Sequence, residues 1–181
     1  MTTYCQYCRD HPEDTFNRNY HDTQYGFPLN DDNLLFERLV FEINQAGLSW
    51  VLILKKADHF RKAYHNFEIA RVAKYGERDR NRLLADAGII RNRLKVNAAI
   101  INAQRILALQ KQFGSFQNWL DAYHPLSKGD WVNLFKKNFI FTGGEIVGEF
   151  LLSTGYLPGA HEKTCPTYRT IAALRPAWMR K

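Results

Sequence analysis

A carboxylate stands on the apolar side of an expected helix near position 40. At 100° per residue, Leu35, Leu39, Glu42 and Ala46 fall within about 60° of one another. An unpaired carboxylate there is costly, because burial removes its hydration. Such a group either pairs with a cation for structural reasons or is held for chemistry, often with a raised pKa. Trp50 follows after a short break, so an aromatic ring can share a cleft with Glu42.

Cysteine and histidine residues form two short clusters, Cys5 with Cys8 and His161 with Cys165. Two such pairs are typical of a tetrahedral zinc site, which here would tie the two ends of the chain together. If residues 161–165 are helical, a spacing of four places the second pair on one face. A redox C-x-x-C or ordinary buried cysteines are the alternatives. A redox pair normally follows a strand, however, and no strand signal precedes Cys5.

A turn with two glycines at residues 138–144 joins two further expected helices. Glycines at the start of the second helix would expose backbone amides. Lys136 and Lys137 lie just before the turn, so the segment suits a phosphate group. An ordinary connection between helices has the same sequence features, so the turn alone does not decide between the two.

The composition is that of a globular chain with unevenly distributed charge. Of its 181 residues, 45% are hydrophobic and 14% aromatic, which excludes a disordered or disulfide-dense protein. The sequence contains no signal-peptide pattern and no membrane-spanning apolar stretch, so we expect a soluble, cytoplasmic protein. The net charge is +7, although the first 50 residues carry eight acidic and three basic residues. The basic remainder favours a polyanionic partner or forms a solvated helical surface.

Capping residues and glycines divide the chain into helices, and the first clear helix begins at residue 32. The expected helices cover residues 32–46, 50–64, 69–75, 79–87, 91–112, 116–122, 131–137, 144–153 and 168–174. No segment alternates apolar and polar residues at period two for long enough to form a strand. We therefore predict an all-α fold.

Several of these motifs together resemble the bacterial DNA-3-methyladenine glycosylase I family, in the helix-hairpin-helix glycosylase superfamily. The resemblance extends over most of the chain, and its most specific stretch is Glu-x-x-Gln-Ala-Gly-Leu-Ser-Trp, from Glu42 to Trp50. The other matching motifs are Tyr20-His21-Asp22, Tyr25–Pro28, Leu54–Lys56, Asp86–Arg91, Phe139–Gly143 and the pair His161 and Cys165.

The resemblance implies a helix-hairpin-helix fold with two helical lobes, forming one glycosylase domain over residues 1–181. It also implies a monofunctional enzyme that hydrolyses the N-glycosidic bond of 3-methyladenine in alkylated double-stranded DNA, as a step of base excision repair. The base would be flipped into an aromatic pocket. Free 3-methyladenine is the expected product, no membrane is involved, and we expect a monomer.

The resemblance further implies roles for individual residues. Glu42 matches the active-site glutamate, Tyr20 and Trp50 match aromatic residues of the base pocket, and Asn17 stands where a pocket tyrosine is usual. The DNA-binding hairpin is matched by Lys136, Lys137, Phe139, Ile140, Phe141, Thr142 and Gly143. The ligands of a structural zinc ion are matched by Cys8, His21, His161 and Cys165. Spacing alone would instead favour Cys5 over His21.

The expected chemistry suits these residue types. The 3-methyladenine of alkylated DNA is a cation, which favours electron-rich ring faces and a nearby carboxylate. No lysine directly follows Gly143, where bifunctional relatives place one, so strand cleavage is not expected. Tyr25 replaces a more usual tryptophan, Asn138 replaces a glycine, and the segment before the hairpin is short. These departures leave open a non-catalytic, zinc-containing DNA-binding paralogue or an enzyme for a different modified base or free nucleoside.

Overall fold

The computed structural model describes residues 2–180, and no strand occurs among them. The α-helices are α1 (Tyr4–Asp10), α2 (Thr15–Thr23), α3 (Asp32–Gln45), α4 (Trp50–Ala63), α5 (Ile69–Val72), α6 (Glu77–Ala85), α7 (Arg93–Phe113), α8 (Phe116–Tyr123), α9 (Lys128–Asn138), α10 (Gly144–Ser153) and α11 (Pro166–Ala173). Two short 3-10 helices are η1 (His65–Phe67) and η2 (Ala177–Met179). The prediction of an all-α fold is confirmed.

Helices α1 and α2 lie outside the predicted set, although each begins at a regular cap. The Thr3 hydroxyl accepts a hydrogen bond from the Gln6 amide, and the Asp14 carboxylate accepts one from the Asn17 amide. The two helices have only seven and nine residues, so neither repeats an apolar pattern over several turns. What they bury is a set of cysteine, histidine and tyrosine side chains, which a hydrophobic pattern does not detect.

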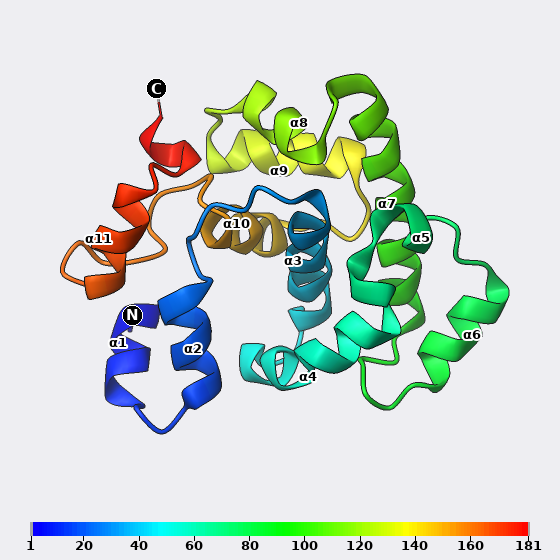
Figure 1. The fold of residues 1–181 in the computed structure, drawn as a ribbon, viewed down its shortest axis with the longest axis horizontal. Helices are drawn as coiled ribbons and strands as arrows, with labels where there is room; N and C mark the ends of the chain where they lie inside the picture. Colours follow the sequence, from blue (N-terminus) through cyan, green and yellow to red (C-terminus); the bar gives the residue numbers. More distant parts are fainter. Residues whose placement is uncertain (1, 181) are drawn as a thin grey trace.

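Helix α3 lies in the middle of the molecule, next to α10 (Figure 1). It packs against α4, α7, α8 and α10, so every residue from Leu35 to Asn44 is buried. The carboxylate of Glu37 is compensated by Arg61, whose Nη2 lies 2.7 Å from Oε1. A helix enclosed on all sides gives its side chains fixed positions, which is what a precise site requires.

The side chain of Asp32, in the first turn of α3, also holds the start of α8. One carboxylate oxygen accepts hydrogen bonds from the Phe116 amide at 2.7 Å and from the Gln110 side chain at 2.6 Å. The other accepts from the Gln117 amide at 3.0 Å. These bonds satisfy amides that the first turn of α8 leaves without partners. Asp32 thus connects the central helix to the helix that follows α7.

The two ends of the described chain come together on one side of the molecule. Helices α1 and α2 lie beside the segment that contains α11, at the left of Figure 1. The amide of Gly26 donates to the carbonyl of Ser153 at 2.9 Å, which joins the chain after α2 to the end of α10. None of the helices in residues 2–180 is long and apolar enough to cross a membrane.

We predict that Asp32→Ala lowers the free energy of unfolding by about 1–3 kcal/mol, because it leaves several donors at the start of α8 without acceptors. Urea unfolding followed by far-UV circular dichroism measures the change. The matched control is Asp58→Ala, which removes an aspartate that is 94% exposed and paired only with Arg61. This control should change stability little. Equal losses in the two variants would contradict the capping role of Asp32.

Candidate functional site

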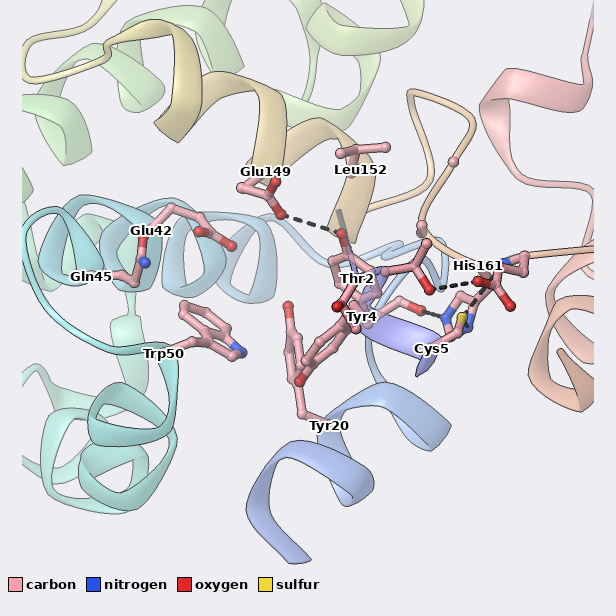
Figure 2. Close-up of a pocket in the computed structure, with 15 residues that line it drawn as sticks. Thr2, Tyr4, Cys5, Tyr20, Glu42, Gln45, Trp50, Glu149, Leu152 and His161 are labelled. Carbon is pink, nitrogen blue, oxygen red and sulfur yellow. Dashed lines mark hydrogen bonds between the residues drawn. The ribbon is translucent and has the colours of Figure 1, made fainter. Parts of the chain in front are cut away.

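A cavity of about 600 Å³ lies where α3 and α10 meet the N-terminal helices and the segment before α11 (Figure 2). Its walls include three tyrosines, a tryptophan and three glutamates: Tyr4, Tyr20, Tyr25, Trp50, Glu42, Glu149 and Glu162. This volume is in the range of small-molecule sites. Aromatic walls with a few acidic groups suit a flat, nitrogen-rich ring that carries positive charge.

The carboxylate of Glu42 reaches the cavity from the middle of α3. Glu42 is only 4% exposed, and it forms no salt bridge with any residue from 2 to 180. Burial raises the pKa of its carboxyl group to about 8, against the opposing effect of the Arg38 guanidinium and with a further contribution from Glu149. The predicted active-site glutamate is therefore a buried carboxyl group that gains and loses its proton near neutral pH.

Aromatic rings form a connected wall beside Glu42. The ring centroids of Tyr20 and Trp50 lie 5.0 Å apart, those of Tyr20 and Tyr25 5.7 Å, and those of Tyr4 and Tyr25 5.2 Å. Arg38 fixes Tyr20, because its Nη1 donates to the phenol oxygen at 2.8 Å and its guanidinium lies 4.9 Å from the ring centroid. Tyr20 and Trp50 thus lie on the cavity together, and their role in binding a base stays a prediction.

The loop before α4 brings Trp50 to the cavity. Gly47 adopts φ +80°, a left-handed conformation that glycine takes without strain and that ends α3 next to Trp50. The buried Lys95 Nζ donates to the carbonyls of Asn44 and Ala46, both at 2.7 Å, and so fixes the last turn of α3. The indole Nε1 of Trp50 is buried without a hydrogen-bond partner among residues 2–180. This donor remains available for a ligand.

A second cluster, of two cysteines and two histidines, lies at one end of the cavity. Its members are Cys5, His21, His161 and Cys165, whose ligand atoms all lie within 4.8 Å of one another. The Cys5 sulfur lies 3.6 Å from His161 Nδ1 and 3.3 Å from His21 Nε2, and the Cys165 sulfur lies 3.6 and 3.8 Å from the same two nitrogens. Ligands around a tetrahedral zinc ion stand about 3.4–3.8 Å apart, given the usual zinc–ligand bond lengths. The four residues therefore fit such an ion.

The cluster corrects the predicted ligand set. Cys8 is not among the four residues, and Cys5 takes its place. Both cysteines are buried, but they stand three residues apart on α1, and it is Cys5 that contacts His21 and His161. Residues 161–165 are not helical, since α11 begins at Pro166 with Cys165 as its N-cap. A turn rather than a helix face brings His161 and Cys165 together.

The remaining ring nitrogens of the two histidines also have partners. His21 Nδ1 lies 2.7 Å from a carboxylate oxygen of Asp22, and His161 Nε2 lies 2.8 Å from the Tyr25 carbonyl oxygen. Such outer partners fix the tautomer and orientation of histidines that bind metals. His161, in turn, couples the cluster to Tyr25 on the cavity wall.

Asn17 does not line the cavity, so its prediction as a base-pocket residue is wrong. It is buried in α2, where its Nδ2 donates to Asp14 at 2.7 Å and its Oδ1 accepts from the Tyr4 hydroxyl at 2.8 Å. Its structural effect is to orient Tyr4. The tyrosine that faces the cavity from α2 is Tyr20, nearly one helical turn further along.

The turn between α9 and α10 is fixed by α7. The Asn102 side chain pairs with both backbone groups of Ile140, at 3.1 and 3.0 Å, and Arg105 donates to the Asn138 carbonyl at 3.0 Å. Phe141 is 39% exposed and adopts φ +60°. These hydrogen bonds from α7 hold the backbone from Ile140 to Gly143 in one conformation.

Not every residue predicted to contact DNA in this turn has an accessible side chain. Lys136, Lys137, Phe141 and Gly143 are exposed and Ile140 is half-buried, whereas Phe139 and Thr142 are buried. The Phe139 ring packs on Phe116 and Trp119, with centroids 5.7 and 5.6 Å away. The predicted role of Phe139 and Thr142 in DNA binding stays a prediction, which their backbone rather than their side chains would have to fulfil. These two residues anchor the turn in the core.

Sequence reasoning did not select Tyr4 or Glu149 as cavity residues. Tyr4 belongs to a helix that was not expected, and no local pattern indicated its position. Glu149 had a usable signal, because Ile146 and Leu152 flank it at i−3 and i+3 on α10. The argument that selected Glu42, a carboxylate beside apolar neighbours on a helix, applies to Glu149 as well.

We predict that Glu42→Gln stabilises the protein in a pH-dependent way. The folded pKa of about 8 lies above the ordinary 4.5, so the folded state binds this proton more tightly than the unfolded state. The stability contributed by proton binding is complete below pH 4.5 and is lost as the pH rises through 8. Glutamine avoids that loss, so the variant should match the wild type near pH 4.5 and exceed it by on the order of 2–4 kcal/mol at pH 9. Urea unfolding across this range measures the difference, and a pH-independent difference would contradict the prediction.

Comparison with known proteins agrees with the geometry of the site. The family model described as methyladenine glycosylase matches residues 10–136. A DNA-3-methyladenine glycosylase of Haemophilus influenzae is 32% identical over 185 residues, which cover 92% of this chain and 98% of that protein.

Solved structures show the same relationship. A crystal structure of a tyrosine-to-phenylalanine variant of 3-methyladenine DNA glycosylase I in complex with 3-methyladenine has a TM-score of 0.80 and 32% identity. The match covers 88% of this chain and 96% of that one. A glutamate-to-glutamine variant of the Staphylococcus aureus enzyme has a TM-score of 0.81 and 31% identity, with the same coverage. By sequence and by fold, this chain belongs to the methyladenine glycosylase family.

Proposed function

We propose that this protein is a monofunctional DNA glycosylase that releases 3-methyladenine from alkylated double-stranded DNA, in base excision repair. The observation that carries the proposal is the buried carboxyl group of Glu42 beside the rings of Tyr20 and Trp50, in a cavity large enough for a purine. A base inside duplex DNA cannot reach such a cavity unless it is flipped out of the stack. Alkylated DNA is thus the partner, and free 3-methyladenine is a product.

The cavity residues bind the flipped base by complementary charge and shape. The faces of Tyr20 and Trp50 are electron-rich and attract a cationic ring. The ionised Glu42 attracts the same charge and accepts hydrogen bonds from the base, and the Trp50 Nε1 supplies a donor. The Arg38 guanidinium donates a hydrogen bond to the Tyr20 hydroxyl, and this bond positions the tyrosine ring.

Hydrolysis breaks the bond between N9 of the base and C1′ of the sugar. The bonding electron pair goes to N9, so the cationic base leaves as a neutral molecule. Water adds a hydroxyl group to C1′, and the remaining proton passes to solvent. Glu42 acts as the catalytic residue by holding the base and by stabilising the positive charge that moves toward the sugar. The positive charge already on the base makes it a good leaving group, so strong acid catalysis is unnecessary.

The α9–turn–α10 segment forms the proposed helix-hairpin-helix element that binds the DNA backbone. The backbone amides near Gly143 open α10, and Lys136 and Lys137 are exposed in the last turn of α9, before the same connecting turn. Amides and lysines of this kind suit a phosphate. None of the described residues that line the cavity is a lysine, and a lysine is the group that would form a Schiff base with the opened sugar. This supports hydrolysis without strand cleavage.

We further propose that Cys5, His21, His161 and Cys165 hold one structural zinc ion. The spacing of the four ligand atoms and the outer partners of both histidines support this assignment. The ion would tie α1 and α2 to the segment before α11. Residues 1–181 would then work as one glycosylase domain of two helical lobes, active as a monomer on DNA in the bacterial cytoplasm.

The first test is release of 3-methyladenine from methylated duplex DNA by the purified protein. Glu42→Gln should lower the single-turnover rate by at least on the order of a hundredfold, because the amide carries no negative charge. The control Glu68→Gln, an exposed glutamate outside the cavity, should keep the wild-type rate. Chromatography of the released base measures each rate. If the wild-type protein releases no 3-methyladenine, the proposed function is wrong, and an unchanged rate in Glu42→Gln would remove Glu42 from the mechanism.

The second test concerns the metal. We predict about one zinc ion per natively purified chain, little zinc in Cys5→Ser, and a melting temperature lowered in that variant. Cys8→Ser is the matched control, since Cys8 is equally buried on the same helix but lies outside the cluster. Elemental analysis and thermal unfolding give the two readouts. Zinc-free wild-type protein, or zinc loss in Cys8→Ser alone, would contradict the assignment.

A further inference from the structure

A second carboxylate faces the base cavity. Glu149 projects from α10, which packs against α3, and Figure 2 shows the carboxyl groups of Glu149 and Glu42 pointing into the same space from the two helices. Glu149 is half-buried, and its Oε2 accepts a hydrogen bond from the Tyr25 hydroxyl at 3.2 Å. Of the three glutamates that line the cavity, Glu162 is paired with Arg9 at 3.0 Å, which leaves Glu42 and Glu149 on two adjoining walls.

The cationic side chains near Glu42 and Glu149 form no salt bridge with either carboxyl group. From α3, the Arg38 guanidinium donates to the Tyr20 hydroxyl and the Ser153 carbonyl rather than to either carboxylate. From α9, Lys128 is half-exposed, and its Nζ lies 3.8 Å from Glu145 on the outer side of α10. Neither Glu42 nor Glu149 forms a salt bridge within residues 2–180. The two carboxyl groups therefore lack a salt-bridge partner in the described part of the chain.

Burial and mutual repulsion act on both groups. Burial raises the pKa of Glu149, while the Tyr25 hydrogen bond and Lys128 oppose the rise and Glu145 adds to it. The negative charge of Glu149 in turn contributes to the raised pKa of Glu42. A pair of one buried and one half-buried carboxyl group is most easily ionised when a cation enters between the two.

We propose that Glu149 is a specificity-determining residue of the cavity, which together with Glu42 selects purine bases that carry a positive charge. The inference rests on the proposed function and deepens it. An N3-alkylated purine nucleoside is a cation, whereas unmodified purines are neutral. A second carboxylate therefore strengthens binding of the damaged base and adds nothing for the large excess of undamaged bases.

The same charge explains how the product leaves. Cleavage sends the bonding electrons to N9, so the released base is neutral and loses its attraction to both carboxylates. The base has nearly the same shape before and after cleavage, and the two carboxylates of Glu42 and Glu149 distinguish the two forms by their charge. Glu149 thus favours binding before the reaction without retaining the base afterwards.

The test compares two ligands that differ in charge. The probes are 3,9-dimethyladeninium, which keeps the charge of the alkylated nucleoside, and neutral 3-methyladenine at pH 8. Calorimetric titration of the full-length protein measures both affinities. Glu149→Gln should weaken binding of the cation by about tenfold and change binding of the neutral base less than about twofold. Glu145→Gln, which removes an exposed charge from the same helix, should change neither.

Tyr25→Phe distinguishes the effect of the Glu149 charge from that of the local structure, because it removes the hydrogen bond to Glu149 but keeps the carboxylate. It should largely retain the preference for the cation. Two results with Glu149→Gln would overturn the inference: equal losses of affinity for both probes, or an unchanged affinity for the cation. A loss of preference for the cation in Tyr25→Phe as large as in Glu149→Gln would overturn it as well. A wild-type protein that binds the cation preferentially but releases no base from DNA would instead refute the proposed function alone.

Discussion

The structure depends on keeping a carboxyl group inside the protein without a cationic partner. Glu42 lies on a helix that is enclosed along its whole middle section, so its position is fixed and water has little access to it. Such a group opposes folding whenever it is ionised, and the hydrophobic core around α3 must compensate for this. The surrounding helices satisfy the neighbouring polar groups, as Arg61 does for Glu37 and Lys95 for the end of α3, and leave Glu42 free to meet a ligand.

Much of the helical architecture could be predicted from the sequence, because capping residues and glycines mark the ends of most helices. Asp31 and Ser115 cap α3 and α8 as their sequence positions indicate. The position of Glu42 was predictable because a carboxylate among leucines breaks an otherwise regular pattern. The first two helices were not predicted, since each is too short to repeat a pattern and their buried side chains contact distant residues.

The errors at the site have the same physical origin. Cys5 and Cys8 are equally plausible ligands in the sequence, and only the packing of α1 against α2 decides that Cys5 meets His21. Asn17 and Tyr20 lie on one short helix, and the direction of each side chain depends on how that helix is rotated against Tyr4 and Arg38. Phe139 lies in a turn that looks exposed in sequence, yet three neighbouring aromatic rings bury it.

The cavity is built from both ends of the chain, because Tyr4 and Cys5 line it together with residues 159–162. Cys5 and His161 belong at the same time to the four-residue cluster. During synthesis on a ribosome, the first wall residues emerge long before the last ones. A nascent chain therefore has no complete cavity until residues 159–162 have left the exit tunnel. The cavity that Glu42 faces is thus completed late in synthesis, well after α3 itself has emerged.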